Sequence, residues 1–451
     1  MNGMPHAIAE ATRPVRVAFR TFGCKLNLYE SSGMAQAAAR RGYRITQVLD
    51  EAEVVVVNTC SVTAHADQEA RQFLRAMHRR RPSARLVVTG CYAQRAAQEL
   101  AALPGVALVA GHAEKDALDA LLGALPGAGD PPRILVGPLT GKVMTRLRAV
   151  GAEGRTRALL RVQDGCDSAC SYCVVPRTRG ASRSLSLEEA LEEAHRLLDG
   201  GFRELVVTGT HLGQYGTDLT PRSSLADLLE GILRLSSPHS FRVRLSSIEP
   251  QEITPRIVDL LAGSERLAPH LHLPLQSGSD DLLRAMRRSY RTPAYRRQVL
   301  AVSSRVRPLA LGADLILGFP GETEADFRRT LAFLAELPFT HLHPFTFSPR
   351  PGTLAAEFPG RPQGDIAARR VAAATALVAE KNRAFRRGLL GRAVRVLVEE
   401  TDAEGVSEGF DEHYLRVRFR GARGLSGRFA SVALSELTEG GLSGHLIEAL
   451  P

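Results

Sequence analysis

Hydrophobic positions in the first third of the chain alternate between short apolar runs and amphipathic stretches. Apolar runs at residues 15–21, 54–57 and 85–89 are separated by stretches that predict helices over 30–41 and 67–80. Short runs of consecutive apolar residues are typical of strands that are buried in a parallel sheet. The pattern therefore predicts a doubly wound α/β domain over residues 14–125.

Two further domains are indicated by changes in the pattern. Residues 126–154 are rich in Gly and Pro and predict a linker. Residues 155–386 alternate strands with helices, and the six expected strands at 158–162, 204–208, 241–246, 270–273, 313–317 and 341–345 predict a partial (β/α)6 TIM-type barrel. Strict alternation from residue 388 to 451 predicts a small antiparallel β-barrel. The fold class is thus α/β with three domains.

Charge and hydropathy limit the cellular setting and the partners. Lysine and arginine number 58 against 48 acidic residues, and the net charge of +10 fits a polyanionic partner such as a nucleic acid. The first 15 residues lack the apolar core of a secretory signal. No apolar run approaches the roughly 20 residues that cross a bilayer. We therefore expect a cytoplasmic protein with no membrane partner.

Six cysteines divide into two groups of three, the first of which is spread over the N-terminal domain. Cys24, Cys60 and Cys91 each follow directly on the carboxyl end of a predicted parallel strand. These ends share one edge of an open sheet, so the three thiols should converge. Three unrelated buried thiols are the alternative. A closed zinc site normally takes a fourth ligand, whereas three thiolates around an iron–sulfur cluster leave one iron open for chemistry.

The second group, Cys166, Cys170 and Cys173, lies in a single loop after the first predicted barrel strand. Three thiolates at this spacing can hold three irons of a 4Fe-4S cluster and leave the fourth for an external ligand. S-adenosylmethionine can chelate that iron, and an electron from the cluster can cleave its sulfonium to give a 5′-deoxyadenosyl radical. A zinc loop is the alternative, but no second Cys or His pair follows the three cysteines.

With both groups in hand, the chain resembles the methylthiotransferase family of radical S-adenosylmethionine enzymes over nearly its full length. The resemblance is carried by residues 21–27 (TFGCKLN), 58–63 (NTCSVT), 89–94 (TGCYAQ), 165–176 and 179–180. The last domain is similar to the TRAM β-barrel, which binds the substrate in this family. The resemblance implies two 4Fe-4S clusters, held by the two cysteine groups, and two molecules of S-adenosylmethionine per turnover.

The same resemblance implies further contacts with the cofactor. Most of these positions end predicted barrel strands, which form the catalytic face of such barrels. The implied cofactor-binding residues are Tyr172, Thr208, Gly209, Ser247, Glu249, Gln276 and Asp314.

Residues 29–31, 62–63 and 244–250 look most like the family branch that modifies N6-threonylcarbamoyladenosine at position 37 of tRNA. The implied activity converts this nucleoside to its 2-methylthio derivative, and the implied partners are the tRNA anticodon stem-loop and a flavodoxin- or ferredoxin-like electron donor. Other branches act on isopentenyladenosine in tRNA or on an aspartate of a ribosomal protein. A non-catalytic zinc- and RNA-binding protein is a more distant reading.

Overall fold

The N-terminal domain is built on a six-stranded parallel sheet. The computed structural model describes residues 13–127, 129–139, 144–148, 156–421 and 424–450. In sheet order the strands are β2 (Arg44–Ile45), β1 (Arg16–Thr21), β3 (Val54–Thr59), β4 (Arg85–Gly90), β5 (Val106–Ala110) and β6 (Arg133–Leu135). Every residue of β3 is buried, because hydrophobic clusters cover both faces of the sheet. Strand β6 lies in the segment that was predicted to be a linker.

Helices connect these strands and begin directly at the strand ends. The helices are α1 (Lys25–Arg40), α2 (Ala64–Arg80), α3 (Cys91–Arg95), α4 (Ala97–Ala101) and α5 (Leu118–Leu121). Helix α1 begins five residues before the predicted start at residue 30. Its N-cap is Cys24, whose side chain makes no capping hydrogen bond, so the usual sequence signal for a helix start is missing. Helix α2 also begins early, and the Thr63 side chain caps it by accepting from the Ala66 amide.

Six parallel strands form the central domain. They are β7 (Arg157–Arg161), β10 (Glu204–Thr208), β11 (Arg242–Leu245), β12 (His270–His272), β13 (Ala310–Leu317) and β14 (His341–Thr346). They pair as two three-stranded sheets, and single bridges such as Ser247 to His272 join β11 to β12. Each strand lies next to its predecessor in the chain, which confirms the partial (β/α)6 barrel. A short hairpin, β8 (Gln163–Asp164) with β9 (Arg183–Ser184), follows β7.

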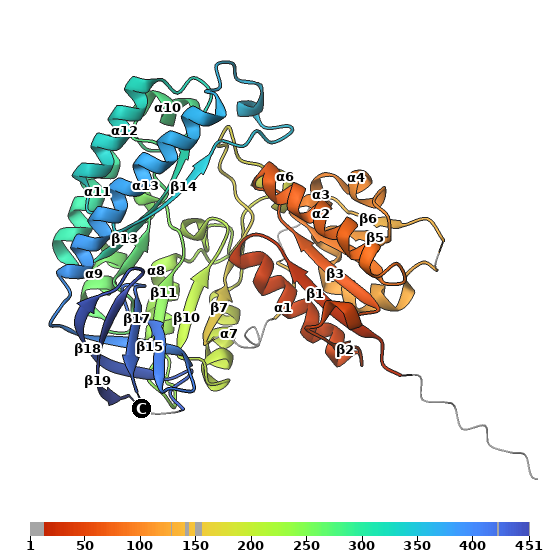
Figure 1. The fold of residues 1–451 in the computed structure, drawn as a ribbon, viewed down its shortest axis with the longest axis horizontal. Helices are drawn as coiled ribbons and strands as arrows, with labels where there is room; N and C mark the ends of the chain where they lie inside the picture. The colour runs from red at the N-terminus through yellow and green to blue at the C-terminus, as the bar shows by residue number, and fades with distance from the viewer. Residues whose placement is uncertain (1–12, 128, 140–143, 149–155, 422–423, 451) are drawn as a thin grey trace, which may run out of the picture.

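Helices cover the outside of this partial barrel (Figure 1). They are α7 (Leu187–Asp199), α8 (Leu225–Leu233), α9 (Pro255–Gly263), α10 (Asp280–Ala285), α11 (Thr292–Arg305), α12 (Glu324–Glu336) and α13 (Gly364–Arg387), while the short α6 (Val175–Arg179) packs against α3 of the N-terminal domain. Side chains of Ser186, Ser224, Thr254 and Thr323 cap α7, α8, α9 and α12. The largest hydrophobic cluster of the protein fills the space between these helices and the strands.

A closed five-stranded barrel forms the C-terminal domain, in the order β15-β16-β17-β19-β18. Its strands are β15 (Ala393–Thr401), β16 (Val406–Phe410), β17 (Arg416–Arg420), β18 (Phe429–Leu437) and β19 (Leu442–Ala449). The barrel was predicted, but one pair differs from the antiparallel expectation, since β17 and β19 are parallel. Strand β19 is inserted between β17 and β18, and alternation of polar and apolar residues is the same in parallel and antiparallel pairs.

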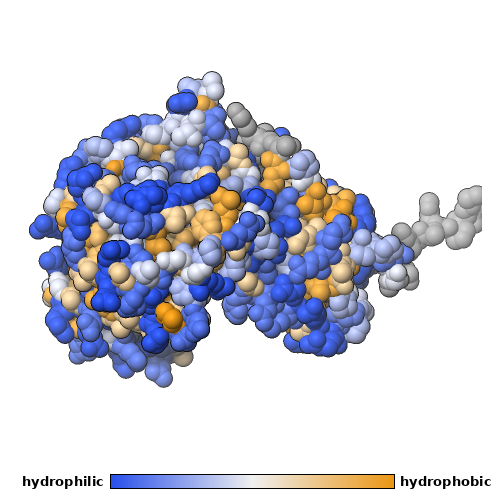
Figure 2. Space-filling view, turned by 90° about the horizontal axis from the view of Figure 1, so that it is seen from above, coloured by the Kyte–Doolittle hydropathy of each residue, from blue (hydrophilic) through white to orange (hydrophobic). Residues whose placement is uncertain are grey.

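Figure 1 shows the N-terminal domain on the right and the central domain on the left, with the C-terminal barrel below the central domain. On the face shown in Figure 2, apolar residues form small patches among hydrophilic ones on both large domains. Among the described residues, no helix has the length and apolar content that crossing a membrane requires.

Candidate functional site

The three N-terminal cysteines lie at the carboxyl ends of β1, β3 and β4, which are adjacent in the sheet. Cys24, Cys60 and Cys91 all line one cavity of about 1120 Å³. Gly23 precedes the first of them at φ +95°, and a Cβ at this position would lie 2.7 Å from Cys60 Sγ. The turn after β1 therefore requires glycine, both for its backbone conformation and for its close approach to a thiol.

The spacing of the thiols argues against a single metal ion. Among the described residues, two groups of potential ligands have all their ligand atoms within 4.8 Å of one another, and neither group contains a cysteine. Sulfurs on one zinc ion would be at most about 4.6 Å apart, because each Zn–S bond is about 2.3 Å. A cluster of four irons is larger and suits the wider spacing of both cysteine groups, so three thiols without a fourth fit such a cluster.

Burial dominates the electrostatics of the first cysteine group. It raises the pKa of Cys60 to about 12, and the neighbouring Cys91 and Cys24 act in the same direction. Burial also raises the pKa of Cys91, while Arg179 opposes the effect. Thiols in this setting stay protonated until a bound cation displaces their protons, as expected of ligands rather than of free nucleophiles.

The second cysteine group occupies the loop between β8 and α6. The Sγ atom of Cys166 lies 3.3 Å from Nδ1 of His211, whose Nε2 lies 2.6 Å from a carboxylate oxygen of Glu252. The guanidinium of Arg288 donates to Cys170 Sγ at 3.3 Å and also to the carboxylate of Glu249. These contacts hold the cysteine loop against the segments that follow β10 and α10.

The thiols of this loop differ in their surroundings. Burial raises the pKa of Cys173 to about 12, with Cys170 and Cys166 adding to the effect. Burial would also raise the pKa of Cys166, but hydrogen bonds from His211 and Ser168 outweigh it and lower that pKa. The surroundings therefore favour the thiolate form of Cys166 more than that of Cys173.

The implied cofactor residues separate into two sets. Thr208, Gly209, Ser247 and Asp314 line the cavity together with the first cysteine group. Tyr172, Glu249 and Gln276 are absent from the described cavity lining. Glu249 is nevertheless tied to Cys170 through Arg288, and Gln276 is a buried non-glycine residue with φ 64°. The cofactor roles of all seven residues remain predictions.

Asp314 is held between two histidines inside the cavity. Its Oδ1 lies 3.0 Å from Nε2 of His272 and 3.6 Å from Nδ1 of His343. Burial would raise the pKa of Asp314, but the two imidazoles overcome this and hold it well below its usual range. Asp314 is therefore an ionised group that is already engaged by the protein.

A buried ionic network joins the N-terminal domain to the central barrel beside the cavity. Arg179 donates to Glu30 at 3.0 Å and to Asn27 at 2.7 Å, both on α1. The same guanidinium donates to Asp164 at 3.0 Å, two residues before Cys166. Through Arg179, the segment that follows Cys24 is fixed to the segment that leads into the second cysteine group.

The C-terminal barrel closes the third side of the cavity. Arg242 and Arg244 of β11 donate to backbone carbonyls of residues 395 and 410–412, and both also bind the buried carboxylate of Glu204. Tyr414 packs beside the ring of His270, with centroids 5.4 Å apart, and both line the cavity. One cavity is therefore built by all three domains.

Several residues of the site carried no signal in the sequence. His211, Arg288 and Tyr414 are single side chains outside any short spacing pattern, and contacts such as those of His211 with Cys166 and of Arg288 with Glu249 join residues 45 and 39 positions apart. Lys25 also lines the cavity. Its place in the motif at residues 21–27 is the sequence signal that could have identified it as a site residue.

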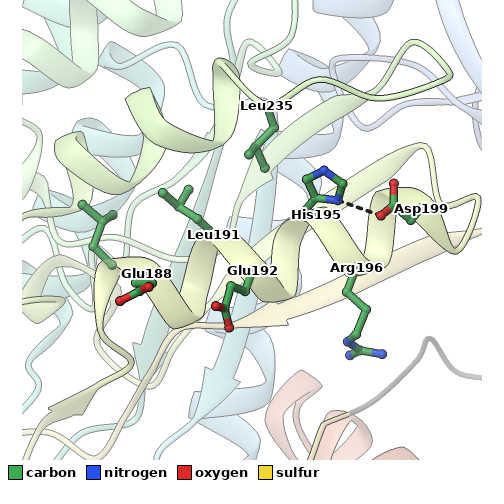
Figure 3. A pocket seen from close by; sticks show the side chains of 8 residues that line it. Glu188, Leu191, Glu192, His195, Arg196, Asp199 and Leu235 are labelled. Carbon is green, nitrogen blue, oxygen red and sulfur yellow. Dashed lines mark hydrogen bonds and ion pairs between the residues drawn. The ribbon is translucent and has the colours of Figure 1, made fainter.

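A second hollow lies on the outer surface of α7 (Figure 3). This open groove of about 880 Å³ is lined by Leu191, Glu192, His195 and Asp199, among others. His195 Nδ1 and Asp199 lie 2.7 Å apart, one turn apart on the helix. Among the described residues, no cysteine lines this groove, whereas three line the cavity between the domains.

Comparisons with known proteins agree with this division of the chain. Residues 16–111 match the model described as uncharacterized protein family UPF0004, and residues 160–334 match the radical SAM superfamily. The radical S-adenosylmethionine methyltransferase TsrM from Kitasatospora setae aligns with a TM-score of 0.56 at 16% identity, over 76% of this chain and 75% of that chain. This likeness shows a shared fold.

Curated relatives extend over nearly the whole chain. Threonylcarbamoyladenosine tRNA methylthiotransferase MtaB of Thermotoga maritima is 36% identical over 94% of this chain and 96% of its own length. The tRNA-2-methylthio-N(6)-dimethylallyladenosine synthase of Cereibacter sphaeroides is 32% identical over 96% of this chain and 99% of its own length.

Proposed function

The chain belongs to the methylthiotransferase family of radical S-adenosylmethionine enzymes, and we propose that it adds a methylthio group to N6-threonylcarbamoyladenosine at position 37 of tRNA. The product is the 2-methylthio derivative of this nucleoside. The relative from Thermotoga maritima carries this substrate in its name and is the more similar of the two relatives. The enzyme works in the cytoplasm, where tRNA is modified.

One observation carries the proposal. The cavity of about 1120 Å³ is lined at once by Cys24, Cys60 and Cys91, by the strand ends at Thr208 and Ser247, and by Tyr414 of the C-terminal barrel. An enzyme that only generates a radical has no use for a second convergent cysteine group. An anticodon-loop base is single-stranded and can be splayed into such a cavity.

We propose that Cys24, Cys60 and Cys91 hold one 4Fe-4S cluster and that Cys166, Cys170 and Cys173 hold the other. When bound, the clusters and two molecules of S-adenosylmethionine supply the radical chemistry and the methylthio group. The protein orients the second cysteine loop through His211 and Arg288. Thr208, Gly209, Ser247 and Asp314 bind the cofactor from the strand ends, and an exposed surface near the loop receives a flavodoxin- or ferredoxin-like electron donor.

The C–H bond at C2 of adenine is not acidic enough for base catalysis, so the residues of the cavity serve to position the base and to exclude water. Arg179 keeps the two cysteine groups in fixed relation by binding α1 and Asp164 together. Side chains of all three domains thus determine where C2 lies relative to both groups.

Mass spectrometry of tRNA nucleosides from strains with and without the gene tests the proposal. The 2-methylthio derivative of N6-threonylcarbamoyladenosine should disappear on deletion and return when the gene is restored. A strain that carries the Cys60→Ala variant is the matched control and should accumulate N6-threonylcarbamoyladenosine without the methylthio group. Unchanged levels of the 2-methylthio derivative would contradict the proposed substrate.

Isopentenyladenosine is the second candidate substrate, because the relative from Cereibacter sphaeroides is 32% identical over 96% of this chain. The same nucleoside profile separates the two candidates. Loss of 2-methylthio-isopentenyladenosine on deletion would favour the second. A change in a ribosomal protein without any change in tRNA would point to the protein-modifying branch.

A further inference from the structure

Two buried residues that line the cavity each have a polar side-chain atom without a hydrogen-bond partner among the described residues. Ser246 directly follows β11 and His270 is the first residue of β12, and each is 7% exposed. Neither the hydroxyl of Ser246 nor Nδ1 of His270 makes a hydrogen bond within the described part of the chain. Buried polar atoms are almost always hydrogen-bonded in native proteins, so unpaired atoms at the wall of a cavity are available to a polar ligand.

A cation from another domain lies close to these two groups. Lys25 follows Cys24 at the start of α1, and its side chain lines the same cavity. Lys25 and His270 are near enough to interact electrostatically. Within the described residues, no carboxylate forms an ion pair with Lys25, whereas the nearby Arg157 and Arg244 are paired with Glu399 and Glu204.

Three basic side chains lie near one another in this part of the cavity. Arg157 and Arg244 both lie over the ring of Tyr414, and both interact with Lys25 electrostatically. Glu399 pairs with Arg157, and Glu204 pairs with both Arg244 and Arg242, whereas Lys25 forms no ion pair within the described residues. An anionic group of a ligand would therefore meet a cation here that has no ion-pair partner of its own.

We propose that Lys25, Ser246 and His270 form a subsite that binds the carboxylate of the threonylcarbamoyl group and so selects this substituent of N6. The inference rests on the proposed function and adds the residues that set its specificity. The substituent contains the carboxylate and hydroxyl of threonine. The ammonium of Lys25 pairs with the carboxylate, and Ser246 and His270 complete its hydrogen bonds.

An apolar substituent would be rejected by the same residues. Isopentenyl offers neither charge nor hydrogen-bonding atoms, so its binding would leave three polar groups unpaired and shielded from water. Sites built to hydrogen-bond a substrate group discriminate strongly against analogues that lack the group. The position of Lys25 directly after Cys24 also places the selected substituent next to the first cysteine group.

Binding of three synthetic anticodon stem-loops to the reconstituted full-length protein tests the subsite. The stem-loops are identical except for position 37, which carries N6-threonylcarbamoyladenosine, its carboxyl methyl ester or isopentenyladenosine. We expect the carboxylate form to bind about 10- to 100-fold more tightly than the other two, as measured by fluorescence anisotropy. In Lys25→Met this preference should vanish, with binding of the isopentenyl form changed less than about twofold.

Two further variants keep the test decisive. Ser246→Ala lies outside the cysteine segments and should lose part of the preference without loss of iron, even if Lys25→Met binds iron poorly. Lys381→Met, on the outer helix α13, is the matched control and should keep the full preference. Equal binding of the acid and its methyl ester by the wild type would overturn the subsite.

The outcomes also separate this inference from the proposed function. If the wild type converts N6-threonylcarbamoyladenosine but Lys25→Met and Ser246→Ala retain its preference, the subsite is wrong and the function stands. If the wild type does not convert this nucleoside in reconstituted assays, the proposed function itself fails.

Discussion

The carboxylate of Glu30 and the guanidinium of Arg179 form a buried ion pair, 3.0 Å apart, that joins the N-terminal domain to the central barrel. Lys115 donates to the other oxygen of the same carboxylate. Burial would raise the pKa of Glu30, but Arg179 and Lys115 outweigh it and hold that pKa well below its usual range. The carboxylate of Glu30 thus contacts at least two buried cations, one from each of two domains.

Replacing Glu30 should weaken the protein far more than replacing an exposed acid. Glu30→Ala leaves Arg179 and Lys115 buried with fewer partners, and breaking a buried pair in this way costs about 3–5 kcal/mol. Urea unfolding of the apo-protein measures this loss. Glu53→Ala, which removes a surface partner of Arg16, should change the free energy of unfolding by less than about 1 kcal/mol. Similar losses in the two variants would show that the network is not a structural joint.

Substitutions in the two cysteine groups should each remove one cluster and leave the other. Reconstituted wild type should contain about eight irons, whereas Cys60→Ala and Cys170→Ala should each contain about four. Only Cys170→Ala should lose reductive cleavage of S-adenosylmethionine, because the cluster proposed for the second group is the one that would bind the cofactor. Anaerobic iron analysis and detection of 5′-deoxyadenosine check both points. Complete loss of iron in either variant would indicate one shared site.

Local patterns were sufficient to predict the strands that carry the cysteines. The valine run that became β3 and the runs that became β10, β11 and β12 are buried throughout, so each has the composition of a central parallel strand. Cysteines placed directly after three such strands necessarily share one sheet edge. The position of Cys24, Cys60 and Cys91 on one cavity follows from this topology.

Contacts between distant segments could not be predicted in the same way. Arg179 and Glu30 are 149 residues apart, and neither lies in a periodic pattern that identifies its partner. Strand β6, three residues long in a Gly- and Pro-rich segment, is too short to give an apolar period. The parallel pairing of β17 with β19 depends on how the chain connects the strands of the barrel. Alternation of polar and apolar residues along each strand does not predict these connections.

The stability of the protein should depend on pH through Glu204. Burial would raise the pKa of this carboxyl, but Arg242 and Arg244 hold it at about 2. In the unfolded chain a glutamate ionises near pH 4.3, so the folded state gains stability that is present above about pH 5 and is lost as the pH falls toward 2. The difference corresponds to about 3 kcal/mol at neutral pH.

Glu204→Gln should remove this component and flatten the acid side of the stability profile. The free energy of unfolding, measured by urea titration between pH 3 and 7, should fall less steeply in the variant than in the wild type. Limited proteolysis should also release the C-terminal barrel sooner, because Arg242 and Arg244 lose the carboxylate that orients them. Glu230→Gln, which removes an exposed partner of Arg256, should keep the wild-type profile.

Arginines on one face of β17 should contribute to tRNA binding without reading the modified base. Arg416, Arg418 and Arg420 alternate with buried residues, and Arg416 lies at the edge of the cavity. Phosphate contacts of this kind weaken with salt and are indifferent to base identity. The double variant Arg418→Ala/Arg420→Ala should therefore bind every stem-loop several-fold more weakly and lower the slope of log K against log salt by about 1 to 2.

The preference for the threonylcarbamoyl group should survive in that double variant, because Lys25, Ser246 and His270 are untouched. Arg305→Ala, on the exposed face of α11, controls for the loss of positive charge and should leave the salt slope unchanged. Titrations at several salt concentrations with modified and unmodified stem-loops provide both readouts. A change of preference with an unchanged slope would mean that β17 contacts the base rather than the phosphates, and would move the specificity from the cavity to the C-terminal barrel.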